Sequence, residues 1–364
     1  MSNHLVSVDA GNGGTNAVRR MKRGKDKYTY FPSVRAAASG DSLGIGDLEL
    51  DYEFYDWNAH RFVVGDDIVH VTRRAVERHH GEDRYGGEFH QFLAAVALHR
   101  LGIKDGQVDI TLFAPPGMYK AGRERILENF GNDGEVRIAG RDGKEMCWQY
   151  DRVEVLPEGV GAALCFAIDA NGDMVNHDAL AGDVLIFDLG MYTGDALLLK
   201  NGKFSPEDLQ HATWDNAGLA SHVLNPILAQ LKKMSADYAV TTIDDVDLAL
   251  RVGLKTGDYI VRSGGTAVDI KPMLEKLTAR YAGWLMNNII SGVFNGLRGI
   301  KSLIIVGGGA MFVMDAFQNE YNKAGDRDKI LDPREHPLTL DLHPVDMNAV
   351  GGLRFGLMKQ RACE

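Results

Sequence analysis

The sequence contains little cysteine and little proline. Its 364 residues include only 3 Cys, at positions 147, 165 and 363, and 10 Pro. The cysteines lie far apart and form no C-x-x-C pair, so we expect neither a disulfide scaffold nor a zinc site, and the expected location is a reducing cytoplasm. Because proline is below its usual share, the composition excludes a Pro-rich linker and a collagen-like chain.

Positive charge is also in deficit, and long apolar runs are missing. Lys and Arg number 40 against 50 Asp and Glu, which gives a formal net charge of -10. An acidic chain has no general attraction for DNA or anionic membranes, so we expect neither direct nucleic-acid binding nor a membrane partner. The longest apolar stretch, about 284–297, is interrupted by Asn, Ser and Gly, which argues against a transmembrane helix.

Glycine, in contrast, is abundant, with 42 residues, and it gathers at the ends of predicted strands. Residues 8–18 (VDAGNGGTNAV) and 187–197 (FDLGMYTGDAL) align without gaps at an offset of 179 residues, 188 minus 9. The matched positions are Asp9 with Asp188, Gly11 with Gly190, Asn16 with Asp195, and Ala17 with Ala196. The pattern indicates one unit used twice: a strand, a tight glycine turn with an acidic residue at its edge, and a second strand.

This unit has a specific chemical use. A turn without Cβ atoms lets backbone N–H groups converge on phosphate oxygens, and an aspartate at the strand end suits a hydrated Mg²⁺ ion. Two facing copies could hold one nucleotide from both sides. A single D-x-G motif more often marks an ordinary turn, but two copies in register favour a nucleotide site.

A third glycine motif supports this interpretation. The apolar segment 303–306 leads into Gly307, Gly308 and Gly309, followed by Ala310 and Met311. Consecutive glycines at a helix start allow a base or ribose to lie against the backbone. Neither the Walker A pattern nor the G-x-G-x-x-G fingerprint occurs, so the motif alone is a weak indication.

Glu158 lies between the two aspartate motifs, at the start of the segment E-G-V-G-A-A. It could polarise a water molecule for attack on a γ-phosphate. Equally, it could be a solvent-exposed residue at a helix start, stabilised by the helix dipole. Near the end of the sequence, the segment 348–356 (NAVGGLRFG) combines small residues with a helical pattern and suits a helix that crosses another closely.

The order of these motifs resembles the actin-type ATPase superfamily, with its phosphate 1, connect 1, phosphate 2, adenosine and connect 2 motifs. Within it, segments 31–33 (FPS), 62–65 (FVVG) and 112–119 (LFAPPGMY) resemble the plasmid-segregation actin-like proteins of the ParM type. The resemblance covers essentially the whole chain. It implies an α/β, actin-like (ribonuclease H-like, duplicated) two-lobed ATPase fold.

The resemblance also implies roles for individual residues. Asp9 and Asp188 would hold Mg²⁺, and Glu158 and Asp188 would be catalytic, with Glu158 orienting the attacking water. The residues expected around the phosphates are Gly11, Asn12, Gly13, Gly14, Thr15, Asn16, Gly190, Met191, Tyr192, Thr193, Gly194 and Asp195. Those expected around the adenosine are Gly307, Gly308, Gly309, Ala310 and Met311, with Asn216 and Gly218 beside the nucleoside.

One residue departs from the family pattern. At Asn16 most actin-like members carry a lysine that reaches the phosphates, so this chain would depend more on backbone donors and Mg²⁺. Arg19 or Arg20 could supply the missing charge. Asp215 is expected to cap a helix that runs to about Lys233.

A basic cluster between the first two motifs could suggest DNA contact. It lacks interleaved aromatic residues and is interrupted by acidic ones, which favours a solvated helix face or a filament contact. Its members are Arg73, Arg74, Arg78, His79, His80 and Arg84.

The implied organisation is two lobes. The first would span 1–160, with a small inserted subdomain at about 28–80, and return at 340–364. The second would span 161–340, with an inserted helical subdomain at about 215–297. Boundaries of this kind place the repeated motifs one in each lobe.

The implied function is a polymerising ATPase that uses ATP/ADP and Mg²⁺, forms homopolymer filaments and segregates plasmid or other DNA. A DNA-binding adaptor protein at a centromere-like site is the expected second partner, and ATP hydrolysis would destabilise the filament. Three alternatives stay open: a cytoskeletal filament protein without DNA cargo, a sugar-kinase-like phosphotransferase, and a module that binds a nucleotide without hydrolysing it.

Overall fold

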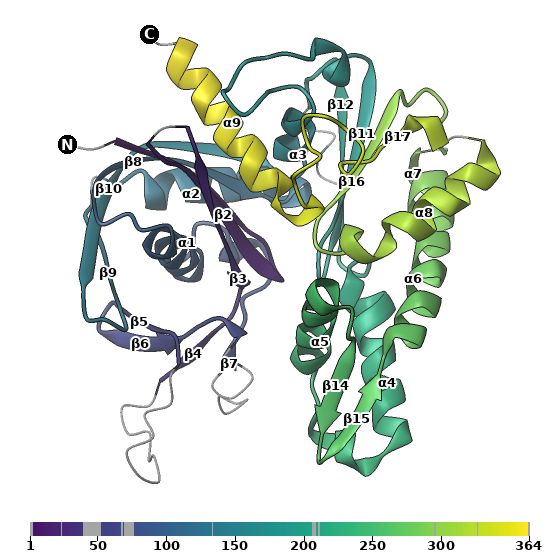
Figure 1. The fold of residues 1–364 in the computed structure, drawn as a ribbon. Helices are drawn as coiled ribbons and strands as arrows, with labels where there is room; N and C mark the ends of the chain where they lie inside the picture. Colours follow the sequence, from purple (N-terminus) through teal and green to yellow (C-terminus); the bar gives the residue numbers. More distant parts are fainter. Residues whose placement is uncertain are drawn as a thin grey trace.

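Two β-sheets organise the chain into two lobes, with a gap between them that both sheets approach (Figure 1). The computed structural model describes residues 3–362 except 23, 39–51, 67, 69–75, 133, 206–208, 210–211, 295 and 326. Arg73 and Arg74 of the basic cluster lie outside the described residues. Among the described helices, none is long and apolar enough to cross a membrane.

The first lobe contains a mixed sheet of the order β3-β2-β1-β8-β10-β9-β5-β6-β4-β7. Its central strands β1, β8 and β10 run parallel, and their buried apolar side chains form one side of a continuous core. The strands are β1 (Asn3–Ala10), β2 (Gly14–Arg20), β3 (Asp26–Pro32), β4 (Arg35–Ala37), β5 (Phe54–Trp57), β6 (His60–Val63), β7 (Val76–Glu77), β8 (Asp105–Ala114), β9 (Val136–Gly140) and β10 (Glu145–Pro157).

Three helices cover this sheet. Helix α1 (Glu88–Arg100) is buried along most of its length and packs against the sheet with α2 (Tyr119–Phe130). The last helix, α9 (Met347–Ala362), returns from the second lobe and lies along β1, β2 and β8. The carboxyl ends of β1 and β10 therefore face the gap between the lobes.

The second lobe contains a sheet of the order β13-β12-β11-β16-β17. Its strands are β11 (Asp183–Leu189), β12 (Gly194–Lys200), β13 (Thr213–Trp214), β16 (Ser302–Val306) and β17 (Ile330–Leu331). A helical region with a β14–β15 hairpin is inserted between β13 and β16 (Figure 1). It comprises α4 (Asn225–Met234), α5 (Ile243–Thr256), β14 (Ile260–Ser263), β15 (Thr266–Asp269), α6 (Lys271–Leu285) and α7 (Ser291–Phe294), and β16 then leads into α8 (Ala310–Ala324).

The predicted duplication is confirmed at the level of strand register. In β1 and β2, Asp9 pairs with Asn16 in an antiparallel hairpin; in β11 and β12, Asp188 pairs with Asp195 in the same way. Each first strand also has a parallel neighbour, β8 in one lobe and β16 in the other. We call residues 11–13 the first turn and residues 190–193 the second turn.

A close helix crossing joins the two lobes. Helix α3 (Val160–Cys165) follows β10 and crosses α9 between the sheets. At the crossing, a Cβ atom built on Gly351 would lie 1.7 Å from the carbonyl oxygen of Gly161. Because no side chain fits into that space, glycine is required at position 351, which explains the small-residue pattern of segment 348–356.

Candidate nucleotide site

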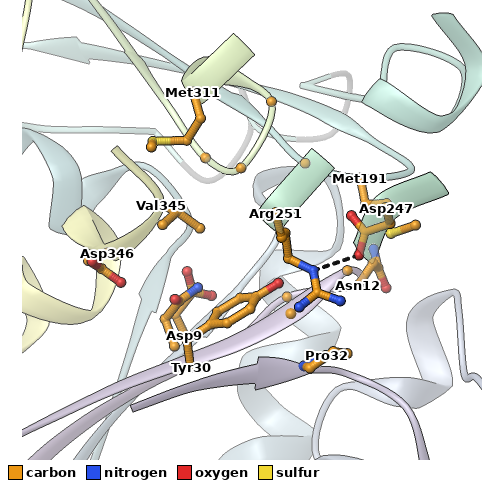
Figure 2. Close-up of a pocket in the computed structure, with 18 of the residues that line it drawn as sticks. Asp9, Asn12, Tyr30, Pro32, Met191, Asp247, Arg251, Met311, Val345 and Asp346 are labelled. Carbon is orange, nitrogen blue, oxygen red and sulfur yellow. Dashed lines mark hydrogen bonds and ion pairs between the residues drawn. The ribbon is translucent and has the colours of Figure 1, made fainter. Parts of the chain in front are cut away.

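A cavity of about 680 Å³ opens between the lobes, where the two turns meet. The turns touch directly: a Cβ atom on Gly13 would lie 2.5 Å from the Cβ atom of Met191. The strand β16 delivers its glycine loop to the same cavity, and Glu158 enters it from the end of β10. Figure 2 shows Asp9 and Tyr30 of the first lobe and Arg251 of the second lining this space.

Most of the predicted site residues line this one cavity although they come from four separate segments. They are Asp9, Gly11, Asn12, Gly13, Gly14, Asn16, Glu158, Asp188, Gly190, Met191, Thr193, Asp195, Gly307, Gly308, Gly309 and Met311. The six predicted residues that do not line it are Thr15, Tyr192, Gly194, Asn216, Gly218 and Ala310.

Three of those six residues pack behind the cavity wall. The Thr15 side chain is buried, and its hydroxyl shares a hydrogen bond of 2.9 Å with that of Ser33. The Tyr192 ring turns away to meet His80 edge-on, at 4.7 Å between ring centroids. A Cβ atom on Gly218 would lie 2.2 Å from the carbonyl carbon of Tyr192, so this glycine packs under the second turn.

The expectation that Asp215 caps a helix is wrong. The helical conformation begins at Ala220, after Leu219, and continues through a π-helical turn into α4. Residues 214–217 form a turn, which the backbone N–H of Ala217 closes by donating to the carbonyl of Trp214. The helix ends at Met234, close to the expected end.

Four carboxylates lie buried in or beside the cavity: Asp9, Glu158, Asp188 and Asp195. Burial and mutual repulsion raise the pKa of Asp9, Glu158 and Asp195, and burial raises the pKa of Asp188 to about 6. Removal from water disfavours a charged carboxylate, and a neighbouring carboxylate disfavours it further. The site thus brings together carboxyl groups whose ionised form a bound cation would stabilise.

Hydrogen bonds fix the carboxylates of the second copy. The amide nitrogen of Asn348 donates to Asp188 Oδ2 at 2.7 Å, while its oxygen accepts from the backbone N–H of Gly159 at 2.9 Å. The hydroxyls of Thr193 and Thr213 donate to Asp195, at 3.1 and 2.5 Å. Asn348 therefore ties α9 to both the second copy and the segment that carries Glu158.

Neither Arg19 nor Arg20 supplies a charge to the phosphate end of the cavity. Arg19 donates to the carbonyls of Leu101 and Gly102, and Arg20 pairs with Asp26. Both lie at the far end of β2, about 10 Å or more from Asn16 at the usual rise of a strand. The suggestion that they replace the missing lysine is therefore wrong.

Two members of the basic cluster contact neighbouring elements instead of lying on a solvated face. Arg84 is 2% exposed and donates to backbone carbonyls at the end of β1 and in the first turn. Arg78 forms an ion pair with Asp244 at the start of α5. The expected solvated face is wrong for both residues.

Sequence reasoning missed the face of α5 that lines the cavity. Asp247, Arg251 and Lys255 lie there. Arg251 donates to Asp247 at 2.9 Å (Figure 2), and it donates to Asp66 of the first lobe at 2.6 Å. Their spacing of four residues is typical of any exposed helix, so no local signal distinguishes them. Tyr30 was also missed; its ring lies against Gly14, where a Cβ atom would approach to 2.4 Å.

The cavity has unused hydrogen-bonding groups, which fit a polar ligand. Glu158 Oε1 and Asn16 Oδ1 are buried without a hydrogen-bond partner among the described residues. Within that part of the chain, no group of three or more His, Cys, Asp or Glu side chains is arranged to hold a metal ion. Asp9 and Asp188 therefore fit Mg²⁺ only in the manner in which one or two carboxylates act together with phosphates and water.

Comparison with known proteins supports the same fold. Residues 7–161 match the family described as the actin-like proteins N-terminal domain. No curated protein matches the chain. Among solved structures, Bacillus thuringiensis ParM with ATP is 18% identical, with a TM-score of 0.70, and the match covers 99% of this chain and 100% of that one.

Two further structures are similar. The archaeal actin homologue Ta0583 is 19% identical, with a TM-score of 0.70 and coverage of 99% and 100%. A Bacillus thuringiensis ParM hybrid protein with ADP, which contains two ParM mutants, is 18% identical with a TM-score of 0.71; the match covers 98% of this chain and 48% of that one. These matches confirm the predicted two-lobed fold and the resemblance on which it was based.

Proposed function

We propose that this chain, which has the actin-like fold and an actin-like N-terminal domain over residues 7–161, binds ATP with Mg²⁺ and assembles into filaments of its own copies. ATP hydrolysis then destabilises the filament. The observation that carries the proposal is the meeting of both copies of the strand–turn–strand unit in one cavity, together with Glu158 and the 307–309 glycine loop. The similar ParM structures include complexes with ATP and with AMPPNP.

The phosphate end of the site would use the two turns. Backbone N–H groups of glycine turns can donate to phosphate oxygens without side-chain interference. Asp9 and Asp188 would hold Mg²⁺, which neutralises charge on the phosphate oxygens when it is bound. The glycine loop 307–309 and Met311 would contact the adenosine.

Glu158 is the candidate for the residue that orients the attacking water. Glu158 lines the cavity, and its Oε1 atom is buried with no partner in the described part of the chain. It can therefore accept a hydrogen bond from a water molecule placed beside the terminal phosphate. The alternative of a solvent-exposed helix-start residue is not supported, since only 9% of Glu158 is exposed.

The cargo is proposed from the ParM-type resemblance. We infer that the filament segregates plasmid or other DNA through a DNA-binding adaptor, because a net charge of -10 gives the chain itself no general affinity for DNA. The likeness to an archaeal actin homologue at the same TM-score equally favours a filament protein without DNA cargo.

Sedimentation with ATP, ADP and AMPPNP, combined with measurement of phosphate release, tests the proposal. We expect pelleting with ATP and AMPPNP, with phosphate release only from ATP, and loss of pelleting as ADP accumulates. Absence of nucleotide-dependent pelleting at high protein concentration would contradict filament formation. Stoichiometric phosphorylation of an added sugar would instead identify a phosphotransferase.

A further inference from the structure

Arg84 is a buried cation directly behind the first turn. Its Nη2 atom donates to the carbonyls of Ala10 at 2.7 Å and Gly11 at 2.8 Å, and its Nη1 atom donates to Asn12 Oδ1 at 2.9 Å. The side chain does not line the cavity, although Gly11 and Asn12 do. Arg84 therefore holds the turn from the side opposite to the proposed nucleotide.

The position of Arg84 is fixed by the segment that carries it. This segment follows β7 and contains a 3₁₀ turn, Glu82–Arg84. On one side, the following residue Tyr85 is buried in the core of the first lobe. On the other, the His80 ring rests on Tyr192 of the second turn. A segment anchored at both ends can place the guanidinium reproducibly.

The geometry of the peptide bond gives these contacts a consequence for ligand binding. In a trans peptide the C=O and N–H groups point in opposite directions. When the carbonyls of Ala10 and Gly11 are directed at Arg84, the N–H groups of Gly11 and Asn12 are directed away from it, toward the cavity side of the turn. Those are the donors that a phosphate group would use.

The charge of Arg84 matters for a second reason. Asn16 is neutral, and the cavity-lining arginines Arg100 and Arg251 are engaged by the carboxylates of Glu53 and of Asp66 and Asp247. Arg35 and Arg354, the other buried arginines of the described residues, bond elsewhere. Arg84 is therefore the buried cation placed to offset the carboxylates at the phosphate end.

We propose that Arg84 is a positioning residue for the phosphate groups: it orients the amides of the first turn and supplies the positive charge that Asn16 lacks. This inference rests on the proposed nucleotide binding. A planar guanidinium can serve three acceptors at once in a fixed geometry, whereas a lysine ammonium supplies only the charge.

Titration of the protein with Mg–AMPPNP, compared among three variants, tests the role. Arg84→Gln should lower the affinity by on the order of ten- to a hundredfold, because it removes buried charge-assisted hydrogen bonds. Arg84→Lys should fall between Arg84→Gln and wild type. Arg35→Gln is the matched control: Arg35 is also buried in the first lobe but pairs with Glu77 and Glu88, so the affinity of this variant should stay within about twofold of wild type.

Hydrogen exchange separates positioning from general destabilisation. Mg–AMPPNP should protect the amides of Gly11 and Asn12 less in Arg84→Lys than in wild type, while the protection of residues 190–193 is retained; a merely structural role would reduce protection in both turns. In wild type, Mg–AMPPNP should slow exchange at Gly11 and Asn12, and unchanged exchange there would contradict the inference even if no Arg84 variant folds.

The outcomes distinguish this inference from the proposed function. If wild type does not bind Mg–AMPPNP, the proposed nucleotide binding is contradicted, and so is the role of Arg84 that depends on it. If wild type binds and the Arg84 variants bind equally well, only the role of Arg84 is overturned. If Arg84→Gln does not fold, the affinity of Arg84→Lys decides.

Discussion

The two copies of the strand–turn–strand unit share a backbone register but differ in how their charges are supported. In the first copy, Asp9 faces the neutral Asn16, and a buried arginine holds the turn from behind. In the second, Asp188 faces another carboxylate, Asp195, which threonine hydroxyls stabilise. The two copies thus share a backbone structure although the charged groups around their aspartates differ.

The divergence gives the two sides of the cavity different characters. The second copy and Glu158 contribute closely spaced carboxylates whose mutual repulsion opposes ionisation. The first copy contributes a carboxylate with a cation nearby: burial and repulsion by Asp188 raise the pKa of Asp9 to about 7, and Arg84 opposes part of that rise. We therefore expect substitutions at matched positions to have unequal effects.

Glu158 lies between the copies, and its replacement should have the largest effect. In Glu158→Gln, phosphate release should fall by about 10²- to 10⁴-fold, because a water-orienting carboxylate is lost, while Mg–AMPPNP affinity changes little and filaments persist longer. Phosphate-release assays and sedimentation measure both quantities. Glu154→Gln is the control, since Glu154 is on the same strand but pairs with Lys359 at the surface. An unchanged rate of phosphate release in Glu158→Gln would show that Glu158 does not orient the water and has only a structural role.

The helix crossing that joins the copies should be the next most sensitive feature. Gly351→Ala places a Cβ atom against the carbonyl of Gly161 and should lower the free energy of unfolding by about 1–3 kcal/mol, the usual cost of overpacking. Urea denaturation monitored by circular dichroism measures this change. Gly283→Ala in α6, where a Cβ atom would meet nothing within 4 Å, should be neutral or stabilising by up to about 1 kcal/mol. Equal effects of the two substitutions would contradict the close crossing.

Asn16→Asp gives the first copy the same paired aspartates as the second, and so tests whether the charge difference between the copies affects nucleotide binding. The added carboxylate would face Asp9 at its paired position, and repulsion should weaken Mg–AMPPNP binding by about tenfold. Calorimetric titration measures the affinity. Asn16→Ser, which adds no charge, is the control and should retain most of the affinity. If Asn16→Asp binds Mg–AMPPNP as tightly as wild type, the charge difference between the copies does not affect nucleotide affinity.

Asp195→Asn makes the second copy resemble the first and should have a smaller effect, on stability. Burial raises the pKa of Asp195 to about 7, so the folded state retains its proton more strongly than the unfolded state does. The free energy of unfolding should therefore fall as the pH rises from about 4 to 7. At pH 8 the nucleotide-free Asp195→Asn protein should be more stable than wild type by on the order of 1 kcal/mol. Thermal unfolding at pH 5 and pH 8 checks the sign, and a wild type that gains stability over this range relative to the variant would contradict it.

The sequence was sufficient to predict the fold, the duplication and about half of the cavity lining. The reason is that the aspartates and glycines of both copies are separated by the same number of residues. The two hairpins therefore have the same strand pairing, with Asp9 opposite Asn16 and Asp188 opposite Asp195. Glu158 and the glycine loop at 307–309 were predictable because each follows a strand whose carboxyl end faces the gap.

The residues that were missed reach the site through long-range contacts. Arg84 lies 73 positions from Gly11 in the chain, and its cluster has the charge pattern of a surface. The residues of α5 reach the cavity only because the inserted helical region folds back toward the first lobe. The prediction that Arg19 or Arg20 replaces the missing lysine was wrong for the opposite reason. Although both residues are near Asn16 in sequence, they lie on an extended strand that leads away from the turn.

Calorimetric titration of the wild-type protein with Mg–AMPPNP tests the central claim, that both copies hold one nucleotide. We expect one nucleotide per chain and severe loss of binding in both Asp9→Asn and Asp188→Asn, since the two carboxylates lie in one cavity. Undetectable binding by wild type, two nucleotides per chain, or full affinity in either variant would contradict it.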